Sequence, residues 1–151
     1  MENSFEIISY IGAKPLLFGM IEAQVEKLVG LPLSRTVNSL GEGNAQYNSY
    51  SVRFSPKDNR LVEIGFSSSA NVSFSGLDIF RRAGAFHKLL LKDSSPYEYY
   101  GFIVLLDLGI TLTGFNDNDA SQYAVTAFAR GRWDHLKPKF KTYIGNQQHG
   151  G

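Results

Sequence analysis

The sequence predicts an α+β fold in which two α-then-β units form an antiparallel sheet with short helices packed on one face. Two observations support this prediction. A short amphipathic segment, Gly19 to Pro32, has helical spacing and a helix stop signal, and a weaker copy returns at Asp78 to Lys92. Hydrophobic segments of strand length follow each copy. We therefore expect one domain over residues 1–144, with units at about 5–75 and 76–134.

The composition fits one packed domain. The chain has 151 residues, of which 43% are hydrophobic, and contains no cysteine. This apolar content predicts a folded chain, and no run reaches the roughly 18 apolar residues of a membrane span. With no signal peptide visible at the N-terminus, we expect a cytoplasmic protein without membrane contact or disulfides. We expect residues 145–151 to be a disordered tail.

The first half begins with an expected strand at Phe5 to Ile11 and continues into the first helix. The apolar face of that helix consists of Ile21, Val25, Leu28 and Val29. Gly30 accepts the left-handed conformation that follows a helix, and Pro32 prevents its continuation.

The next segment, Ser34 to Gln46, is polar and contains two glycines, so we expect a loop. An antiparallel hairpin should follow. Its first strand has Tyr50, Val52 and Phe54 on one face, and Val62, Ile64 and Phe66 form the apolar face of the returning strand.

The second half repeats the pattern less clearly. Val72 and Phe74 suggest a short strand, and Asp78 is a plausible N-cap for the second helix. Gly84 weakens that helix, which leaves two alternatives: one helix, or a single turn followed by a helix at Ala85 to Leu91. Three further strands are expected at 99–106, 110–115 and 123–129.

Two runs of this chain resemble a family of small bacterial proteins. The first is Phe18-Gly19-Met20 leading to Leu28-Val29-Gly30-Leu31-Pro32, and the second spans 106–112 and 125–131. The resemblance covers about 5–134. It implies the tandem αβ arrangement of the β-lactamase-inhibitor protein and the small outer-membrane-assembly lipoproteins, and related proteins are candidate toxin-immunity proteins. The lipoprotein role would need an export signal and an acylated cysteine, neither of which is present.

The sequence predicts no catalytic residue, no cofactor and no metal site. His87, His135 and His149 are not spaced as metal ligands, and we expect His87 to be a partly buried packing residue. The run Asn116 to Asp119 is similar to a calcium loop but lacks its glycine and glutamate, so a turn is the better interpretation.

Two aromatic and basic clusters are the candidate partner-binding residues. Tyrosine, tryptophan and arginine are favoured at protein interfaces because they combine large contact areas with polar groups. The candidates are Tyr97, Tyr99, Tyr100, Arg130, Arg132 and Trp133. We expect them to lie on or near the sheet face away from the helices. Part of that face is polar, because Ser49, Ser51 and Arg53 alternate with apolar residues, as do Thr111 and Thr113. The predicted function is a non-enzymatic bacterial binding protein, an immunity or inhibitor protein that occludes a cognate toxin or enzyme.

The alternative is a nucleic-acid-associated module. Residues 130–143 carry five basic residues against Asp134, although the whole chain has a net charge of only +1. Phosphate and base contacts would come from Lys137, Lys139, Lys141, Trp133, Phe140 and Tyr143. A small enzyme centred on His135, next to Asp134, is the third hypothesis.

Overall fold

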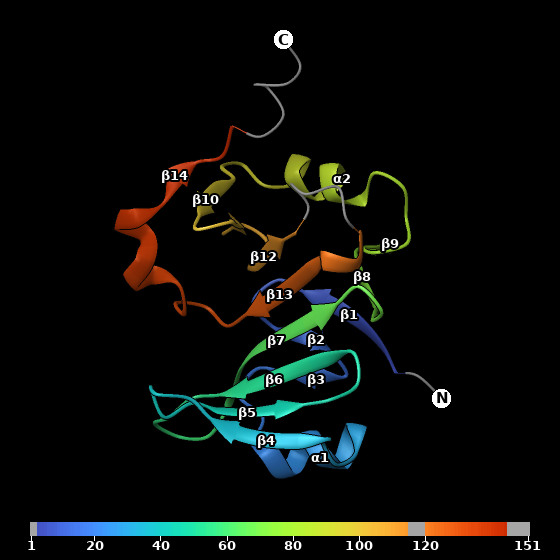
Figure 1. The fold of residues 1–151 in the computed structure, drawn as a ribbon, viewed down its shortest axis with the longest axis vertical. Coiled ribbons are helices and arrows are strands. Elements are labelled where there is room, and N and C mark those ends of the chain that lie inside the picture. Colours follow the sequence, from blue (N-terminus) through green and yellow to red (C-terminus); the bar gives the residue numbers. More distant parts are fainter. Residues whose placement is uncertain (1–2, 115–119, 145–151) are drawn as a thin grey trace.

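The fold is mostly β. The computed structural model describes residues 3–114 and 120–144, and within these ranges the strands form one sheet of nine strands and one of five (Figure 1). The nine-stranded sheet runs, in spatial order, β14 (Lys141–Thr142), β10 (Tyr97–Tyr99), β11 (Phe102–Leu105), β12 (Ile110–Thr113), β13 (Ala124–Phe128), β7 (Leu61–Ser67), β6 (Tyr50–Phe54), β5 (Gly43–Gln46) and β4 (Ser34–Val37). The five-stranded sheet runs β3 (Leu16–Leu17), β2 (Gly12–Lys14), β1 (Ser4–Ile8), β8 (Asn71–Phe74) and β9 (Leu77–Asp78).

The predicted α+β arrangement is wrong. The helices are α1 (Glu22–Val29) and α2 (Ala85–Leu91), with 3-10 turns η2 (Ala120–Gln122) and η3 (Asp134–Lys139). In Figure 1, α1 and α2 lie toward opposite ends of the molecule rather than side by side on one sheet face. A second sheet packs against the large one, with β2 lying close to β7 and β13. The two similar segments of the sequence, Gly19 to Pro32 and Asp78 to Lys92, therefore each contain a helix. They do not define two α-then-β units.

The expected loop at Ser34 to Gln46 is instead the hairpin β4–β5. Its turn is closed by Asn38, whose side-chain oxygen accepts hydrogen bonds from the backbone N–H groups of Leu40 and Glu42 at 2.9 and 3.0 Å. The prediction failed because β4 is an edge strand with all four residues exposed, so it lacks an apolar alternation.

The first helix is confirmed, and the second follows the shorter alternative. The predicted apolar face of α1 is wrong in part, because only Val25 is buried and Ile21 and Leu28 are exposed. Gly30 ends the helix with a φ of 87° and a ψ of −174°, which is not the left-handed conformation that we expected. The second helix begins after Gly84, whose left-handed φ of 75° separates it from the preceding turn. Asp78 caps that turn, since its side chain accepts the Arg81 N–H at 3.1 Å.

The predicted strands are confirmed with three changes. The strand expected at Phe5 to Ile11 ends at Ile8 and is followed by a turn in which Tyr10 has a φ of 64°. In the hairpin β6–β7 the register shifts between Arg53 and Phe54, so Leu61 rather than Val62 joins the buried residues of β7. The strand expected at 99–106 is divided at Tyr100 and Gly101, both with positive φ, into the antiparallel pair β10–β11.

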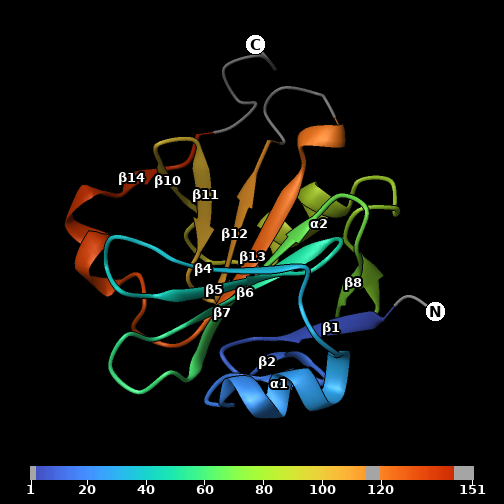
Figure 2. The same cartoon turned by 60° about the horizontal axis from the view of Figure 1, so that its bottom comes forward.

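The core lies between the two sheets. Phe5 of β1 contacts the rings of Tyr50 and Phe66 on the nine-stranded sheet, with ring centroids 4.7 and 5.2 Å apart. The five-stranded sheet joins segments that are far apart in sequence, because β1 pairs in parallel with β8. Figure 2 shows that the nine-stranded sheet twists strongly, so that β4 to β6 run across the direction of β11 and β12.

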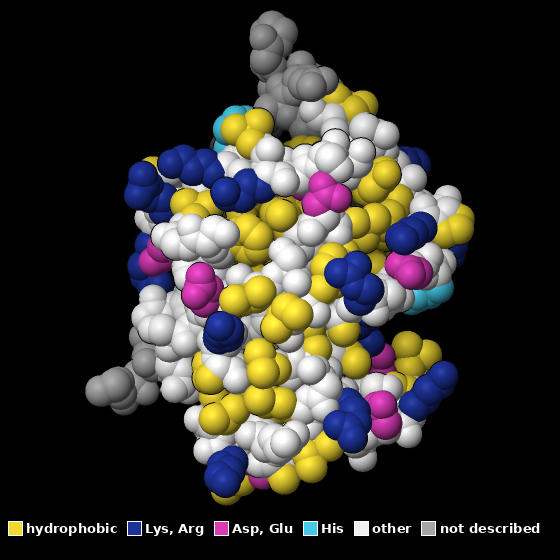
Figure 3. All heavy atoms as spheres, turned by 180° about the vertical axis from the view of Figure 1, so that it is seen from behind, with side chains coloured by type: hydrophobic (Ala, Val, Ile, Leu, Met, Phe, Trp, Pro, Cys, Tyr) yellow, Lys and Arg dark blue, Asp and Glu magenta, His cyan; other side chains and the backbone are white. Residues whose placement is uncertain are grey.

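The surface is mixed. In the view from behind (Figure 3), apolar side chains form several patches separated by charged ones. Among the described helices, none has the length and hydropathy needed to cross a bilayer.

Candidate ligand pocket on the polar sheet face

The nine-stranded sheet has a polar face directed away from the core. Strand alternation places Arg53 and Glu63 opposite each other on this face, and Thr111 opposite Thr126. Gly65 lies between Thr126 and Ser51, and a Cβ at Gly65 would be 3.4 Å from the Thr126 hydroxyl oxygen. We call the surface that these residues form the polar face.

A pocket of about 300 Å³ lies on the polar face. Its floor comes from β6, β7, β12 and β13. The β4–β5 turn forms one wall, and the segment that begins at Arg132 forms another. The lining residues are Asn38, Leu40, Glu42, Arg53, Glu63, Phe102, Thr111, Thr126, Arg132, Trp133, His135 and Leu136.

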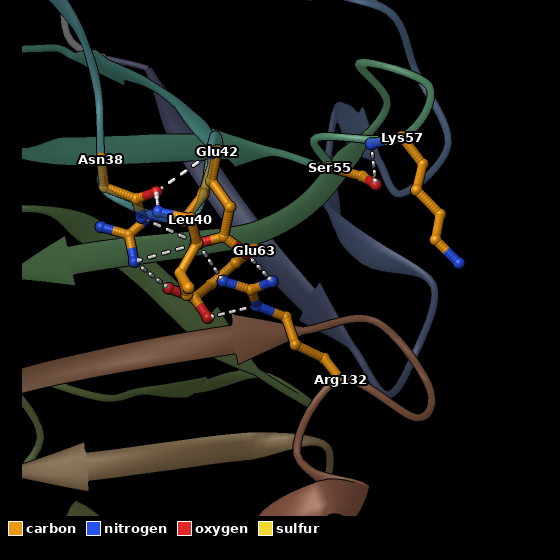
Figure 4. A network of polar contacts seen from close by, with 8 residues as sticks. Asn38, Leu40, Glu42, Ser55, Lys57, Glu63 and Arg132 are labelled. Atoms are coloured by element: carbon orange, nitrogen blue, oxygen red, sulfur yellow. Dashed lines mark hydrogen bonds and ion pairs between the residues drawn. The ribbon is translucent and has the colours of Figure 1, made fainter.

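Arg132 organises the charges of the pocket. Its Nε donates to Glu63 at 2.7 Å, and its Nη1 donates to Glu42 at 2.8 Å (Figure 4). Arg132 comes from the loop after β13, Glu63 from β7 and Glu42 from the β4–β5 turn, so this contact joins segments distant in sequence. Because charge-assisted hydrogen bonds are stronger than neutral ones, the three groups hold one another in place.

Glu42 is held in its ionised form. The hydrogen bonds from Arg132 lower the pKa of Glu42, and the Asn38 side chain adds a donor at 3.0 Å, whereas burial opposes the shift. Glu42 therefore stays a carboxylate at neutral pH.

Arg53 is the least constrained charge of the pocket. Its Nη1 lies 3.9 Å from Glu42 and 3.8 Å from Glu63, longer than a hydrogen bond. Its Nε is buried without a partner among the described residues. The Arg53 side chain is 36% exposed, against 19% for Arg132, 18% for Glu63 and 10% for Glu42. The charge most accessible from solvent is therefore positive.

The lowered pKa of Glu42 predicts a pH dependence of stability. A carboxyl group whose pKa is lower in the folded state stabilises the fold above its unfolded pKa of about 4.3, and this contribution is lost as the pH falls through the folded value. We expect the free energy of unfolding to decrease below about pH 5, and to decrease less for Glu42→Gln. Urea unfolding at pH 7 and pH 3 measures this, with Glu6→Gln, an exposed site, as the control. An equal decrease for both variants would contradict the assignment.

Comparison with family models, with curated proteins and with solved structures found no match. The resemblance to tandem αβ proteins therefore stays a prediction, and the fold that it implied is not observed.

The structure brings the two predicted clusters together. Trp133 contacts Tyr99 and Phe102, with centroid distances of 6.1 and 5.5 Å. Arg132 and Trp133 line the pocket on the polar face. Tyr97 packs on Phe140 at 5.7 Å instead.

Arg130 does not line the pocket on the polar face. Its guanidinium lies over the ring of Tyr10, 4.2 Å from the centroid. This cation–π contact is part of the packing of the chain.

Tyr99 and Tyr100 line a second hollow of about 340 Å³, with Glu98, Gly101, Lys139 and Lys141. Tyr100 is 85% exposed. Of the residues proposed for nucleic acid, Lys137 is paired with Asp134 at 3.0 Å, and Trp133 and Phe140 pack on each other at 6.3 Å. Of the three lysines proposed for nucleic acid, Lys139 and Lys141 line the same hollow as the exposed ring of Tyr100.

The structure describes two of the three histidines, His87 and His135. Within the described ranges, no group of three or more potential His, Asp or Glu ligands lies together. His135 lies at the rim of the pocket, and His87 is exposed on α2 rather than partly buried as predicted. The turn expected at 116–119 and His149 lie outside the described residues.

Sequence reasoning missed most of the pocket. Arg53 and Thr111 appear in polar alternations that indicated a polar sheet face, and that signal pointed to the right surface. Glu42 was hidden in the segment expected to be a loop. No local pattern marked Glu63 as a pocket residue, because its partner Arg132 is 69 positions away in the sequence.

Proposed function

We propose that the protein is a non-enzymatic binding protein that occludes a cognate toxin or enzyme by receiving one of its loops on the polar face. The observation that carries this proposal is the pocket in which Arg132 and Trp133 meet Arg53. The charges there are held in place before binding, which lowers the cost of ordering them in a complex.

The dimensions favour a partner's side chain over a large ligand. A pocket of about 300 Å³ is at the small end of ligand sites, and it suits one or two inserted side chains. Exposed apolar groups extend the contact surface beyond the pocket, since Leu40 on its wall is 73% exposed. Aromatic and arginine anchors surrounded by such groups are typical of protein interfaces.

The accessible charge indicates an acidic side chain on the partner. Among the described residues, Nη1 of Arg53 approaches the carboxylates only at 3.8 to 3.9 Å, whereas Glu42 and Glu63 already accept hydrogen bonds from Arg132. An aspartate or glutamate of the partner would complete the hydrogen bonds of Arg53 without displacing that pair.

Occlusion rather than catalysis agrees with the state of the carboxylates. A general acid needs a proton at neutral pH, and the lowered pKa of Glu42 removes it. The two carboxylates and Arg132 instead form a fixed polar floor.

Filling the pocket should weaken binding. We expect Thr126→Leu to weaken capture of the partner at least about tenfold, because the larger side chain occupies the floor. The control is Thr113→Leu, a half-buried threonine of the same sheet face that does not line the pocket. The measurement is affinity capture from the native host with each variant, followed by mass spectrometry and titration of the captured protein.

Two outcomes would contradict the proposal. Equal capture by both variants would place the interface elsewhere. Capture of nucleic acid that weakens steeply with salt, and is lost on Lys139→Ala with Lys141→Ala, would support the second hollow as a nucleic-acid site instead.

A further inference from the structure

The edge of the nine-stranded sheet at β4 is unlike the other sheet edges. β4 has four residues, whereas β14, β3 and β9 have two each. All four residues of β4 are exposed, and β5 pairs with it on one side. An exposed edge of this length presents unpaired backbone groups and is a template for another strand.

Exposed apolar side chains gather around this edge. Among the described residues, six large apolar side chains are at least 71% exposed, and four of them come from the ten residues around β4. They are Leu31 at 76%, Leu33 at 75%, Val37 at 71% and Leu40 at 73%. A hollow of about 470 Å³ adjoins the edge, lined by Val37 of β4 and Ile21 next to α1. Such a concentration of exposed apolar groups marks an interaction surface.

The charge of β4 is already neutralised within the chain. Arg35 is the one charged residue between Leu31 and Leu40, and it pairs with Glu22, at 3.0 Å, and with Glu26 on α1. A strand that adds to this edge therefore needs no counter-charge. The segment from Leu31 to Leu40 is itself such a strand: it carries exposed apolar side chains, and its one charge is neutralised within the chain. The edge is therefore complementary to the same edge of a second copy.

We propose that two copies of this chain pair through β4, antiparallel, about a two-fold axis at Thr36. Residues that face each other across an antiparallel pair project to the same side of the sheet. Arg35 lies opposite buried Ala45, and Thr36 lies opposite Asn44 on the polar face. A two-fold axis at Arg35 would place the arginines of the two copies opposite each other, which is unfavourable. A two-fold axis at Thr36 places the two threonines opposite each other and Arg35 opposite Val37 of the second copy.

The chain has no cysteine, so a disulfide formed after one cysteine is introduced must join that position in two copies. We expect Thr36→Cys to form a disulfide-linked dimer under mild oxidation, because facing Cβ atoms are about 5 Å apart. The control is Ser34→Cys on the same strand. In this register the two copies of residue 34 are four positions apart, about 13 Å along the strand, which is too far for a disulfide. No cross-link at position 36, or equal cross-linking at both positions, overturns the proposal.

The unmodified chain supplies the second measurement. Sedimentation at micromolar concentration should give a dimer, and Val37→Lys should raise its dissociation constant at least about tenfold. The control is Tyr100→Lys, at another exposed apolar site, away from β4. A monomer, or a monomer that instead binds an extended peptide along β4, overturns the proposal.

The experiments on the two surfaces are independent. Thr126→Leu tests the pocket and should leave dimer formation unchanged, and Val37→Lys tests the edge. Loss of the dimer with retained partner capture would leave the function proposed for the polar face standing.

Discussion

We expect Arg132→Ala to lower the free energy of unfolding by about 3 kcal/mol at pH 7. The substitution leaves Glu42 and Glu63 facing each other with only the more distant Arg53 to neutralise them. Removing one member of a largely buried charge cluster is costly, because the remaining charges are desolvated without compensation. Denaturant unfolding at pH 7 measures the loss, which should shrink at acidic pH as the carboxyl groups take up protons.

The chain contains a matched control for this prediction. Arg35 also bridges two glutamates, Glu22 and Glu26, but its side chain is 50% exposed, against 19% for Arg132. Exposed ion pairs contribute little to stability because water and salt screen them, so Arg35→Ala should have a small effect. Similar losses for both variants would show that burial does not determine the energy of the Arg132 cluster.

We expect Gly12→Ala to lower the free energy of unfolding by about 4 kcal/mol or more. The φ of Gly12 is 152°, and a Cβ there would lie 2.3 Å from the carbonyl oxygen of Leu16 and 2.9 Å from the Cα of Leu17. Both neighbours are backbone atoms of β3, so they cannot move aside as a side chain would. The turn that places buried Ala13 and Leu16 in the core would open. Denaturant unfolding again measures the effect.

The variant Gly30→Ala separates the two possible causes of the Gly12→Ala effect, backbone conformation and steric clash. Gly30 also has a positive φ, 87°, but no atom lies within 4 Å of the position that a Cβ would take there. With a ψ of −174°, Gly30 occupies a backbone region that only glycine enters readily, so alanine there costs about 1–3 kcal/mol from conformation alone. If Gly12→Ala destabilised the protein no more than Gly30→Ala, the close approach of β2 and β3 would not matter energetically.

The sequence predicted local elements better than their arrangement. Val25 and Gly30 identify α1 because the helix signal is contained in a dozen neighbouring residues. The alternation in β6 predicted that hairpin for the same reason. Nothing local indicates that β1 pairs with β8, or that β13 pairs with β7, because these contacts depend on residues far apart in the chain.

The candidate site shows the same division. Arg132 and Trp133 stood out by residue type, and both line the pocket. Arg130 stood out equally, yet its guanidinium lies over Tyr10, which residue type does not predict. Glu42, Asn38 and Leu40 reach the pocket through a hairpin turn that a polar, glycine-containing segment concealed.

The parallel pair β1–β8 also sets the order in which the chain completes its fold. The β6–β7 hairpin needs only neighbouring residues, so it can form early during synthesis. β1 emerges first but waits for β8 before its sheet is complete. Until then Phe5 and Ile7, both buried in the finished core, remain exposed. The first strand to be synthesised is therefore buried only after Asn71–Phe74 has been made, and during this interval its apolar residues are open to chaperone capture or aggregation.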